Sequence, residues 1–172
     1  HLDGWQLTDA TGRGFTIESS LVVPAGGLAV LAASDVASIN GNLPSVDLAY
    51  DYDHFILSST DDDQLVLWMG DEVIDEVAYS NLPPWPSAPG RSTFLRWTTP
   101  DADANDLAES WCLTSAEVAF EYGGEGWGNH GTPGTPNPAG DEDEDGDGLS
   151  VCDGDCNDSE AGIGPGALEV CG

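Results

Sequence analysis

The residues best suited to chemistry lie near the end of the chain, where aspartate recurs at every second position. Asp143, Asp145 and Asp147 alternate with other residues and are followed by Gly148. Calcium binds about six to eight oxygen ligands, and alternating aspartates in a loop direct three carboxylates to one point while a following glycine permits the sharp turn. The backbone carbonyl of Leu149 would supply the next ligand. The spacing therefore predicts a calcium-binding loop.

A second register of the same loop starts two residues earlier. It begins at Asp141 and places Gly146 at the turn position. Neither register has a glutamate where an EF-hand carries its closing bidentate ligand, so the loop is a variant. The closing carboxylates must then come from later aspartates. These candidates are Asp153, Asp155 and Asp158.

A run of acidic residues is more often a solvated linker than a metal site. Here the placement of glycine, the Asn157-Asp158 pair and the flanking cysteines favour Ca²⁺. For an extracellular site of this chemistry we expect a modest dissociation constant of about 10⁻⁴–10⁻³ M. Without the ion, mutual repulsion among the acidic side chains should loosen the tail.

The overall charge of the chain excludes several classes of partner. Its 172 residues include 32 Asp and Glu against 3 Lys and Arg, a formal net charge of −29. Nucleic acid and anionic lipid are bound by clustered cations, so neither is expected as a partner. No apolar run is long enough to span a bilayer, so the sequence predicts no membrane insertion.

The chain has four cysteines, three of them in the Gly/Asp-rich tail. An even number concentrated in this way is typical of disulfides in an oxidising compartment. Free or metal-bound thiols are the alternative. The spacing of Cys152 and Cys156, with no histidine nearby, is poor for zinc.

The rest of the chain reads as short β-strands separated by turns. In the stretch Gln64–Tyr79, apolar residues alternate on both sides of a Gly70-Asp71 turn, the pattern of a β-hairpin. No convincing helical periodicity is present, so we predict an all-β sandwich built around this hairpin. Further strands are predicted over Trp5–Asp9, Phe15–Ile17, Leu28–Ala33, Thr93–Trp97 and Glu109–Leu113, and an irregular stretch over Tyr122–Gly140.

No catalytic constellation stands out. A nucleophile elbow, a phosphate loop and a histidine-rich zinc motif are all absent from the sequence, so we do not expect an enzyme. His54, near Asp51 and Asp53, reads as a surface histidine in preference to a metal ligand. Trp85 and Trp127 could stack on carbohydrate, but in Pro/Gly-rich loops we expect them to pack against the sandwich.

Several short segments match one family when taken in order. They are Gly4-Trp5-x-Leu7-x-Asp9, Phe15-x-Ile17, Val73-Ile-Asp75-x-Val77-x-Tyr79, Trp85-Pro86 and Gly131-Thr-Pro-Gly134. Together they resemble a lamin tail domain of the bacterial, secreted type, over residues 2–138. The resemblance implies that residues 1–138 form an immunoglobulin-like β-sandwich, which secreted bacterial proteins carry as a non-catalytic module.

The acidic tail, residues 139–172, matches a second family. The matching segments are Asp143-x-Asp145-Gly-Asp147-Gly148, Asp155-Cys156-Asn157-Asp158 and Ile163-x-Pro165-Gly166-Ala167-x-Glu169-Val170-Cys171. They resemble a metal-binding repeat of bacterial surface proteins. Under this resemblance Cys156 pairs with Cys171, which leaves Cys112 with Cys152 as a staple between sandwich and tail. The other two pairings of four cysteines remain open.

Lamin tail domains begin with one or two strands before the segment that Gly4-Trp5 matches, and nothing in this sequence supplies them. The chain is then a partial or cleaved one, or a second chain provides the strands, or a neighbouring subunit completes the sheet by strand addition and builds a fibre. Truncation is favoured, with a partner strand next.

The combined reading is a secreted or cell-surface, non-enzymatic structural module with Ca²⁺ in its tail. It would be a building block of a surface layer, sheath or fibre, assembling with copies of itself or with a strand-donating chain. The alternative is an accessory binding or adhesion module excised from a larger secreted enzyme, with carbohydrate as one candidate ligand.

Overall fold

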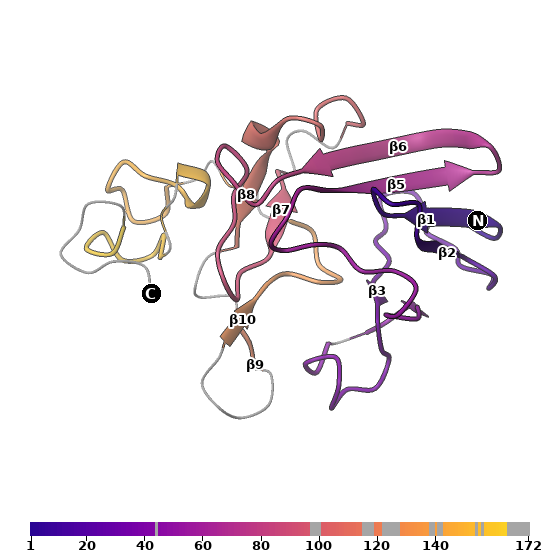
Figure 1. The fold of residues 1–172 in the computed structure, drawn as a ribbon. Coiled ribbons are helices and arrows are strands. Elements are labelled where there is room, and N and C mark those ends of the chain that lie inside the picture. Colours follow the sequence, from indigo (N-terminus) through magenta and orange to yellow (C-terminus); the bar gives the residue numbers. More distant parts are fainter. Residues whose placement is uncertain are drawn as a thin grey trace. The chain divides into compact units, whose positions relative to one another are not determined.

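The computed structural model is built of short β-strands (Figure 1). It describes residues 1–43, 45–96, 101–114, 119–121, 128–137, 140, 143–153, 155 and 157–164. The helices among these residues are two single turns of 3₁₀ helix, η1 (Ala108–Ser110) and η2 (Val151–Asp153), so the predicted all-β class is confirmed. Neither turn is long and apolar enough to cross a membrane. The strands are β1 (Trp5–Thr8), β2 (Gly14–Thr16), β3 (Leu31–Ala32), β4 (Leu48–Ala49), β5 (Asp63–Met69), β6 (Glu72–Tyr79), β7 (Thr93–Leu95), β8 (Trp111–Leu113), β9 (Ala119–Glu121) and β10 (Gly128–His130).

The chain divides into two compact units. The first unit comprises His1–Asn81 with Pro133–Thr135, and the second comprises Leu82–Thr132 with Pro136–Gly172. The change of composition near residue 138 therefore falls inside the second unit, which contains both the tail and β7 to β10.

The predicted hairpin is the centre of the first unit. β5 and β6 pair antiparallel along their whole length, and Gly70 makes the turn between them with a φ of 64°. A β-bulge shifts the register between Leu67 and Trp68. β1 pairs with the other edge of β5 and β2 with β1, which gives the order β2-β1-β5-β6. The hairpin prediction is confirmed, because a glycine with positive φ closes the tight turn that the alternating arms require.

An aromatic cluster packs next to this sheet. The Phe15 ring stacks on Tyr50 with centroids 4.9 Å apart, and Phe55 meets both rings edge-on at 5.3 Å. Phe55 is 4 % exposed and Ile17, which follows β2, is 1 % exposed. Burial of these side chains holds β2 and the segment after β4 in one core.

The strand predicted over Leu28–Ala33 is shorter than expected. Only β3, Leu31–Ala32, forms there, and it pairs in parallel with β4. The Val30 amide instead donates to a side-chain oxygen of Asp47 at 2.8 Å, and the Val30 carbonyl accepts from the Asp47 amide at 2.8 Å. This loop aspartate takes over the backbone groups that a longer strand would have paired.

Two aspartates fasten turns of the first unit to its sheet. One carboxylate oxygen of Asp9 accepts from the Thr11 amide, the Thr11 hydroxyl and the Arg13 amide at 2.7–3.0 Å. Asp63 accepts from the amides of Ala10, Ser58 and Gln64. Burial raises the pKa of both carboxyls, but the hydrogen bonds outweigh it and hold both pKa values below the ordinary range.

The first unit should therefore lose stability in acid, and Asp63→Asn should reduce that loss. A carboxyl whose folded pKa lies below its unfolded value of about 3.9 stabilises fully above that pH and not at all below its folded pKa. Thermal unfolding of the wild type and of Asp63→Asn should differ at neutral pH and converge as the pH falls through this window. Asp62→Asn, an exposed neighbour, is the control. A wild-type to Asp63→Asn difference that does not change with pH would contradict the assignment.

The second unit is organised around the β7–β8 pair. Phe94 lies opposite Cys112 in this pair, and both side chains are buried. Thr114, 1 % exposed, shares a hydrogen bond of 2.7 Å with the Ser92 hydroxyl, and its carbonyl accepts from Arg91 Nε at 2.5 Å. These bonds fix the strand from which the covalent link to the tail starts.

In this unit the strand predicted over Glu109–Leu113 was wrong in its first bound, and the prediction that Tyr122–Gly140 is irregular was wrong at β10. Glu109 and Ser110 belong to η1, because the Ser110 amide turns back to the Leu107 carbonyl at 2.9 Å. β10 lies in the stretch predicted to be irregular, where the His130 amide and carbonyl pair with Gly90 and Ser92. β10 forms through backbone pairing, which does not require the β-branched side chains on which the sequence prediction relied.

Candidate metal site

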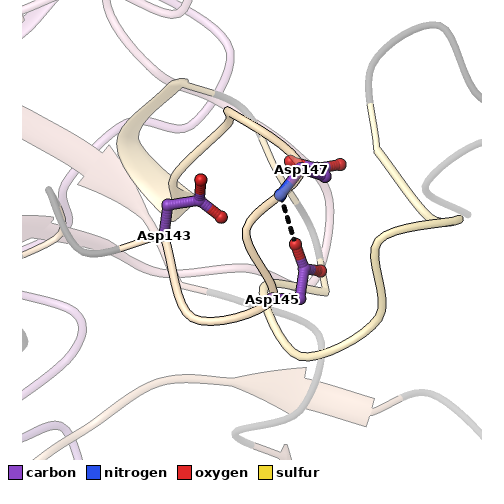
Figure 2. A group of neighbouring side chains, drawn as sticks. All are labelled: Asp143, Asp145 and Asp147. Atoms are coloured by element: carbon purple, nitrogen blue, oxygen red, sulfur yellow. Dashed lines mark hydrogen bonds between the residues drawn. The ribbon is translucent and has the colours of Figure 1, made fainter.

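Three tail carboxylates converge on one point. Asp143, Asp145 and Asp147 each offer an oxygen, and these oxygens lie within 4.8 Å of one another (Figure 2). This is the set predicted for the first register of the calcium loop. In the part of the chain that the structure describes, no other group of three His, Cys, Asp or Glu side chains has this geometry.

The loop folds around its own aspartates. The two carboxylate oxygens of Asp143 accept from the amides of Gly146 at 2.7 Å and Gly148 at 2.9 Å. Asp145 accepts from the Asp147 amide at 3.0 Å. Gly146 and Gly148 have φ of 78° and 95°, a left-handed conformation that glycine adopts without steric cost. The glycines let successive amides turn inward, and the carboxylates are thereby held on one side of the loop.

Asp155 comes from the next turn and is fully buried. Its Oδ1 accepts from the Asn157 amide at 2.9 Å, whereas its Oδ2 has no hydrogen-bond partner. A Cβ built on Gly164 would lie 3.5 Å from Asp155 Oδ1 and 3.7 Å from Asp147 Oδ2, so both carboxylates border the space beside this glycine. Asp155 therefore lies near the cluster of three aspartates, close enough for its charge to act on Asp145, although it is not one of the three converging carboxylates.

Asp143 and Asp147 are exposed, but part of the negative charge in and near the cluster is buried. Asp145 Oδ2, like Asp155 Oδ2, is buried without a hydrogen-bond partner. Desolvation raises the pKa of Asp145, and the charges of Asp147, Asp155 and Asp143 raise it further. An unpaired buried carboxylate is costly. A cation bound among these oxygens would remove that cost.

Asp158 connects its own turn to the loop that carries Asp143, Asp145 and Asp147. It is 8 % exposed, and its Oδ1 accepts from the Glu144 amide at 3.2 Å. Desolvation raises its pKa, followed by the charges of Asp155, Glu144 and Asp143. It therefore lies in the same electrostatic environment as the cluster.

The other predicted ligands have different places. Asp153 is exposed and accepts from the Ser150 amide at 3.2 Å and hydroxyl at 2.8 Å, and these bonds hold its pKa low. It stabilises η2 and lies outside the converging set. The Leu149 amide donates to Asp147 Oδ1 at 2.9 Å. Asp141 lies outside the described residues.

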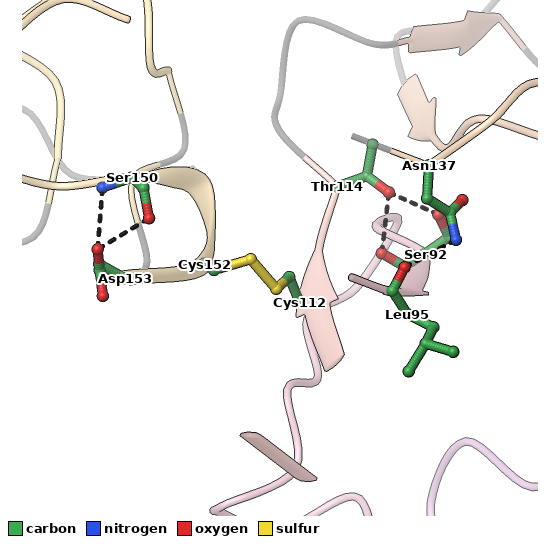
Figure 3. Close-up of a disulfide and its surroundings, with 8 residues drawn as sticks. All are labelled: Ser92, Leu95, Cys112, Thr114, Asn137, Ser150, Cys152 and Asp153. Atoms are coloured by element: carbon green, nitrogen blue, oxygen red, sulfur yellow. Dashed lines mark hydrogen bonds between the residues drawn. A yellow bond between two sulfur atoms is a disulfide. The ribbon is translucent and has the colours of Figure 1, made fainter. Parts of the chain in front are cut away.

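One disulfide joins the tail to the strands of the second unit (Figure 3). It links Cys112 of β8 to Cys152 of η2, with Cα atoms 4.9 Å apart. This is the pair that the metal-binding-repeat resemblance leaves after Cys156 and Cys171, which lie outside the described residues. In the chain-entropy model a loop of 40 residues closed in this way stabilises by about 4 kcal/mol.

Two weaker candidate sites have local roles. His54 Nδ1 lies 2.8 Å from Asp51 Oδ2, in an exposed turn. The ring centroids of Trp85 and Trp111 lie 6.3 Å apart. The indole Nε1 of Trp111 donates a hydrogen bond to the Asn105 carbonyl at 2.7 Å. Trp127 lies outside the described residues.

Sequence reasoning missed Gly164, whose lack of a side chain leaves room between Asp147 and Asp155. Nothing in the local sequence distinguishes it from the tail's other glycines.

Comparison with models of protein families, with curated proteins and with solved structures found no match for this chain.

Proposed function

We propose that this chain is an extracellular, non-catalytic structural module whose tail binds Ca²⁺. The observation that carries the proposal is the buried, unpartnered Asp155 Oδ2 beside the cluster of Asp143, Asp145 and Asp147. Two carboxylates, Asp145 and Asp155, each leave one buried oxygen without a hydrogen bond, and a cation bound there would complete the site.

The donor set decides which cation fits. All the donors are carboxylate oxygens, which suit hard ions such as Ca²⁺ and Mg²⁺ and not the softer metals that prefer cysteine or histidine. Mg²⁺ demands near-ideal octahedral geometry and keeps several waters, whereas Ca²⁺ accepts irregular carboxylate clusters. We therefore assign Ca²⁺ to the site. Once bound, the ion would neutralise the repulsion that raises the pKa of Asp145.

Two further features support an extracellular location. Disulfides such as Cys112–Cys152 persist mainly in oxidising compartments. The modest affinity that we expect of this loop would also suit the abundant calcium outside cells.

For the fold we propose an immunoglobulin-like β-sandwich of the lamin tail type. The antiparallel order β2-β1-β5-β6 supports it as one layer of such a sandwich. Among the residues that the structure describes, the end strands β2 and β6 each have one edge without a neighbour in this sheet, and such edges accept additional strands.

The charge of the β6 edge makes assembly depend on calcium. If two copies paired antiparallel through this strand in the register that sets the exposed Glu72 opposite Glu76, like charges would face each other, and such pairs destabilise a strand pair. With a net charge of −29 per chain, copies of the chain repel one another, and bound divalent cations would reduce that repulsion. We therefore propose that the module is a calcium-dependent building block of a surface layer, sheath or fibre.

Sedimentation velocity of the full chain tests this function. We expect large species in millimolar calcium and their collapse to monomer on addition of chelator. Glu72→Gln with Glu76→Gln should lower the calcium concentration at which large species form, whereas the matched pair Asp61→Asn with Asp62→Asn, exposed before β5, should not. A compact monomer under both conditions would contradict calcium-dependent assembly. The alternative, an accessory module of a larger secreted protein, would then be favoured.

A further inference from the structure

The turn η2 serves both the disulfide and the metal site. On one side Cys152 is bonded to Cys112 of β8, and the Cys152 amide donates to the Gly140 carbonyl at 3.2 Å. On the other side the Asp155 amide donates to the Ser150 carbonyl at 3.1 Å. Ser150 is itself held by Asp153 (Figure 3). The buried ligand Asp155 is thus three residues from the covalent link and bonded to the same turn.

The strand end of this link is rigid. Cys112 is 2 % exposed and lies opposite Phe94, which is 4 % exposed. Gly140 closes over the bond, since a Cβ there would lie 2.2 Å from Cys152 Sγ and 3.5 Å from Cys112 Sγ. The disulfide therefore links η2 to a buried position of the β7–β8 pair.

We propose that the Cys112–Cys152 disulfide positions Asp155 for the ion and is thermodynamically coupled to calcium binding. The inference rests on the proposed calcium site. Without the bond, η2 is released from β8, and Asp155 must be ordered by the ion alone, so calcium binds more weakly. Because linkage is reciprocal, bound calcium in turn protects the disulfide from reduction.

The reduction that reveals this coupling is simple in its chemistry. Dithiothreitol supplies two electrons and two protons, the Cys112–Cys152 bond breaks, and both sulfurs become thiols. The reagent's own two thiols close to a cyclic disulfide. No other reactant is needed.

The first arm of the test is a calcium titration by calorimetry of the wild type and of Cys112→Ser with Cys152→Ser. Coupling of this kind typically changes affinity by roughly 5- to 150-fold, and we expect a loss within that range. The coupling would be overturned if the wild type binds calcium and the variant, with the far-UV circular dichroism of the wild type, binds it with an affinity within about twofold. That result would leave the calcium site intact. A wild type that binds no calcium would overturn both.

The second arm keeps the native cysteines and does not depend on the folding of a variant. The rate at which dithiothreitol opens Cys112–Cys152 is followed by alkylation and peptide mass spectrometry, with calcium and with chelator. We expect calcium to slow reduction in the wild type and in Glu160→Gln, an exposed acid of the same tail, but not in Asp155→Asn. Equal wild-type rates with and without calcium would overturn the proposal.

Discussion

Replacing Asp155 by asparagine should remove most of the calcium affinity of the tail. Asparagine keeps the size of the side chain and can still accept the hydrogen bond from the Asn157 amide, so the turn survives. It removes the negative charge of Asp155, whose side chain is fully buried. Loss of even a supporting group around a metal typically lowers affinity about 10- to 100-fold, and we expect the loss of this ligand to be at least tenfold.

The same substitution should have the opposite effect when calcium is absent. Without the ion, burial is the main cause that raises the pKa of Asp145 and Asp158, and the negative charge of Asp155 raises both further. A neutral side chain removes that repulsion, so the chelated Asp155→Asn chain should resist proteolysis of its tail better than the chelated wild type. Glu160→Gln makes the same change of charge at an exposed position and should leave calorimetric affinity unchanged. An Asp155→Asn dissociation constant equal to that of Glu160→Gln would contradict the ligand assignment.

Gly14→Ala should strongly destabilise the first unit. Gly14 lies opposite Thr8 in the β1–β2 pair, and an added Cβ would lie 2.0 Å from the Leu7 carbonyl oxygen and 2.8 Å from Thr8 Cα. These are backbone atoms, so no side chain can move aside, and β2 must separate from β1. The separation would displace Phe15 from the aromatic cluster with Tyr50. Overpacking of this kind costs about 1–3 kcal/mol, and we expect the upper end.

Denaturant unfolding followed by tryptophan fluorescence measures the loss. Gly162→Ala is the matched control, because a Cβ at Gly162 would meet no atom within 4 Å. Its midpoint should stay close to that of the wild type. If Gly14→Ala unfolds at the same denaturant concentration as Gly162→Ala, the close approach of β1 and β2 is wrong.

Local sequence signals predicted the elements whose geometry is decided locally. The hairpin followed from alternation around Gly70-Asp71, and the convergence of Asp143, Asp145 and Asp147 followed from spacing and glycine placement. In both cases neighbouring residues alone determine which way the side chains point. The truncated strand at Leu31–Ala32 did not follow, because Asp47, distant in sequence, takes the Val30 backbone groups.

The roles of the later aspartates also depended on tertiary structure. Asp153, Asp155 and Asp158 are equivalent in sequence as closing ligands, yet Asp153 is exposed on η2 while Asp155 and Asp158 are buried near the cluster. Burial therefore distinguishes the three aspartates from one another. It is set by how the segment around Asp158 packs on the loop that contains Glu144. The hydrogen bond from Glu144 to Asp158 joins these turns across fourteen residues.

Calorimetric titration of the full, chelator-treated chain with calcium tests the central claim most directly. The account predicts saturable binding with a dissociation constant of about 10⁻⁴–10⁻³ M, and much weaker binding of magnesium. No saturable heat up to about 10 mM calcium, well above that range, would contradict the metal site, and with it the calcium-dependent assembly and the coupling to Cys112–Cys152.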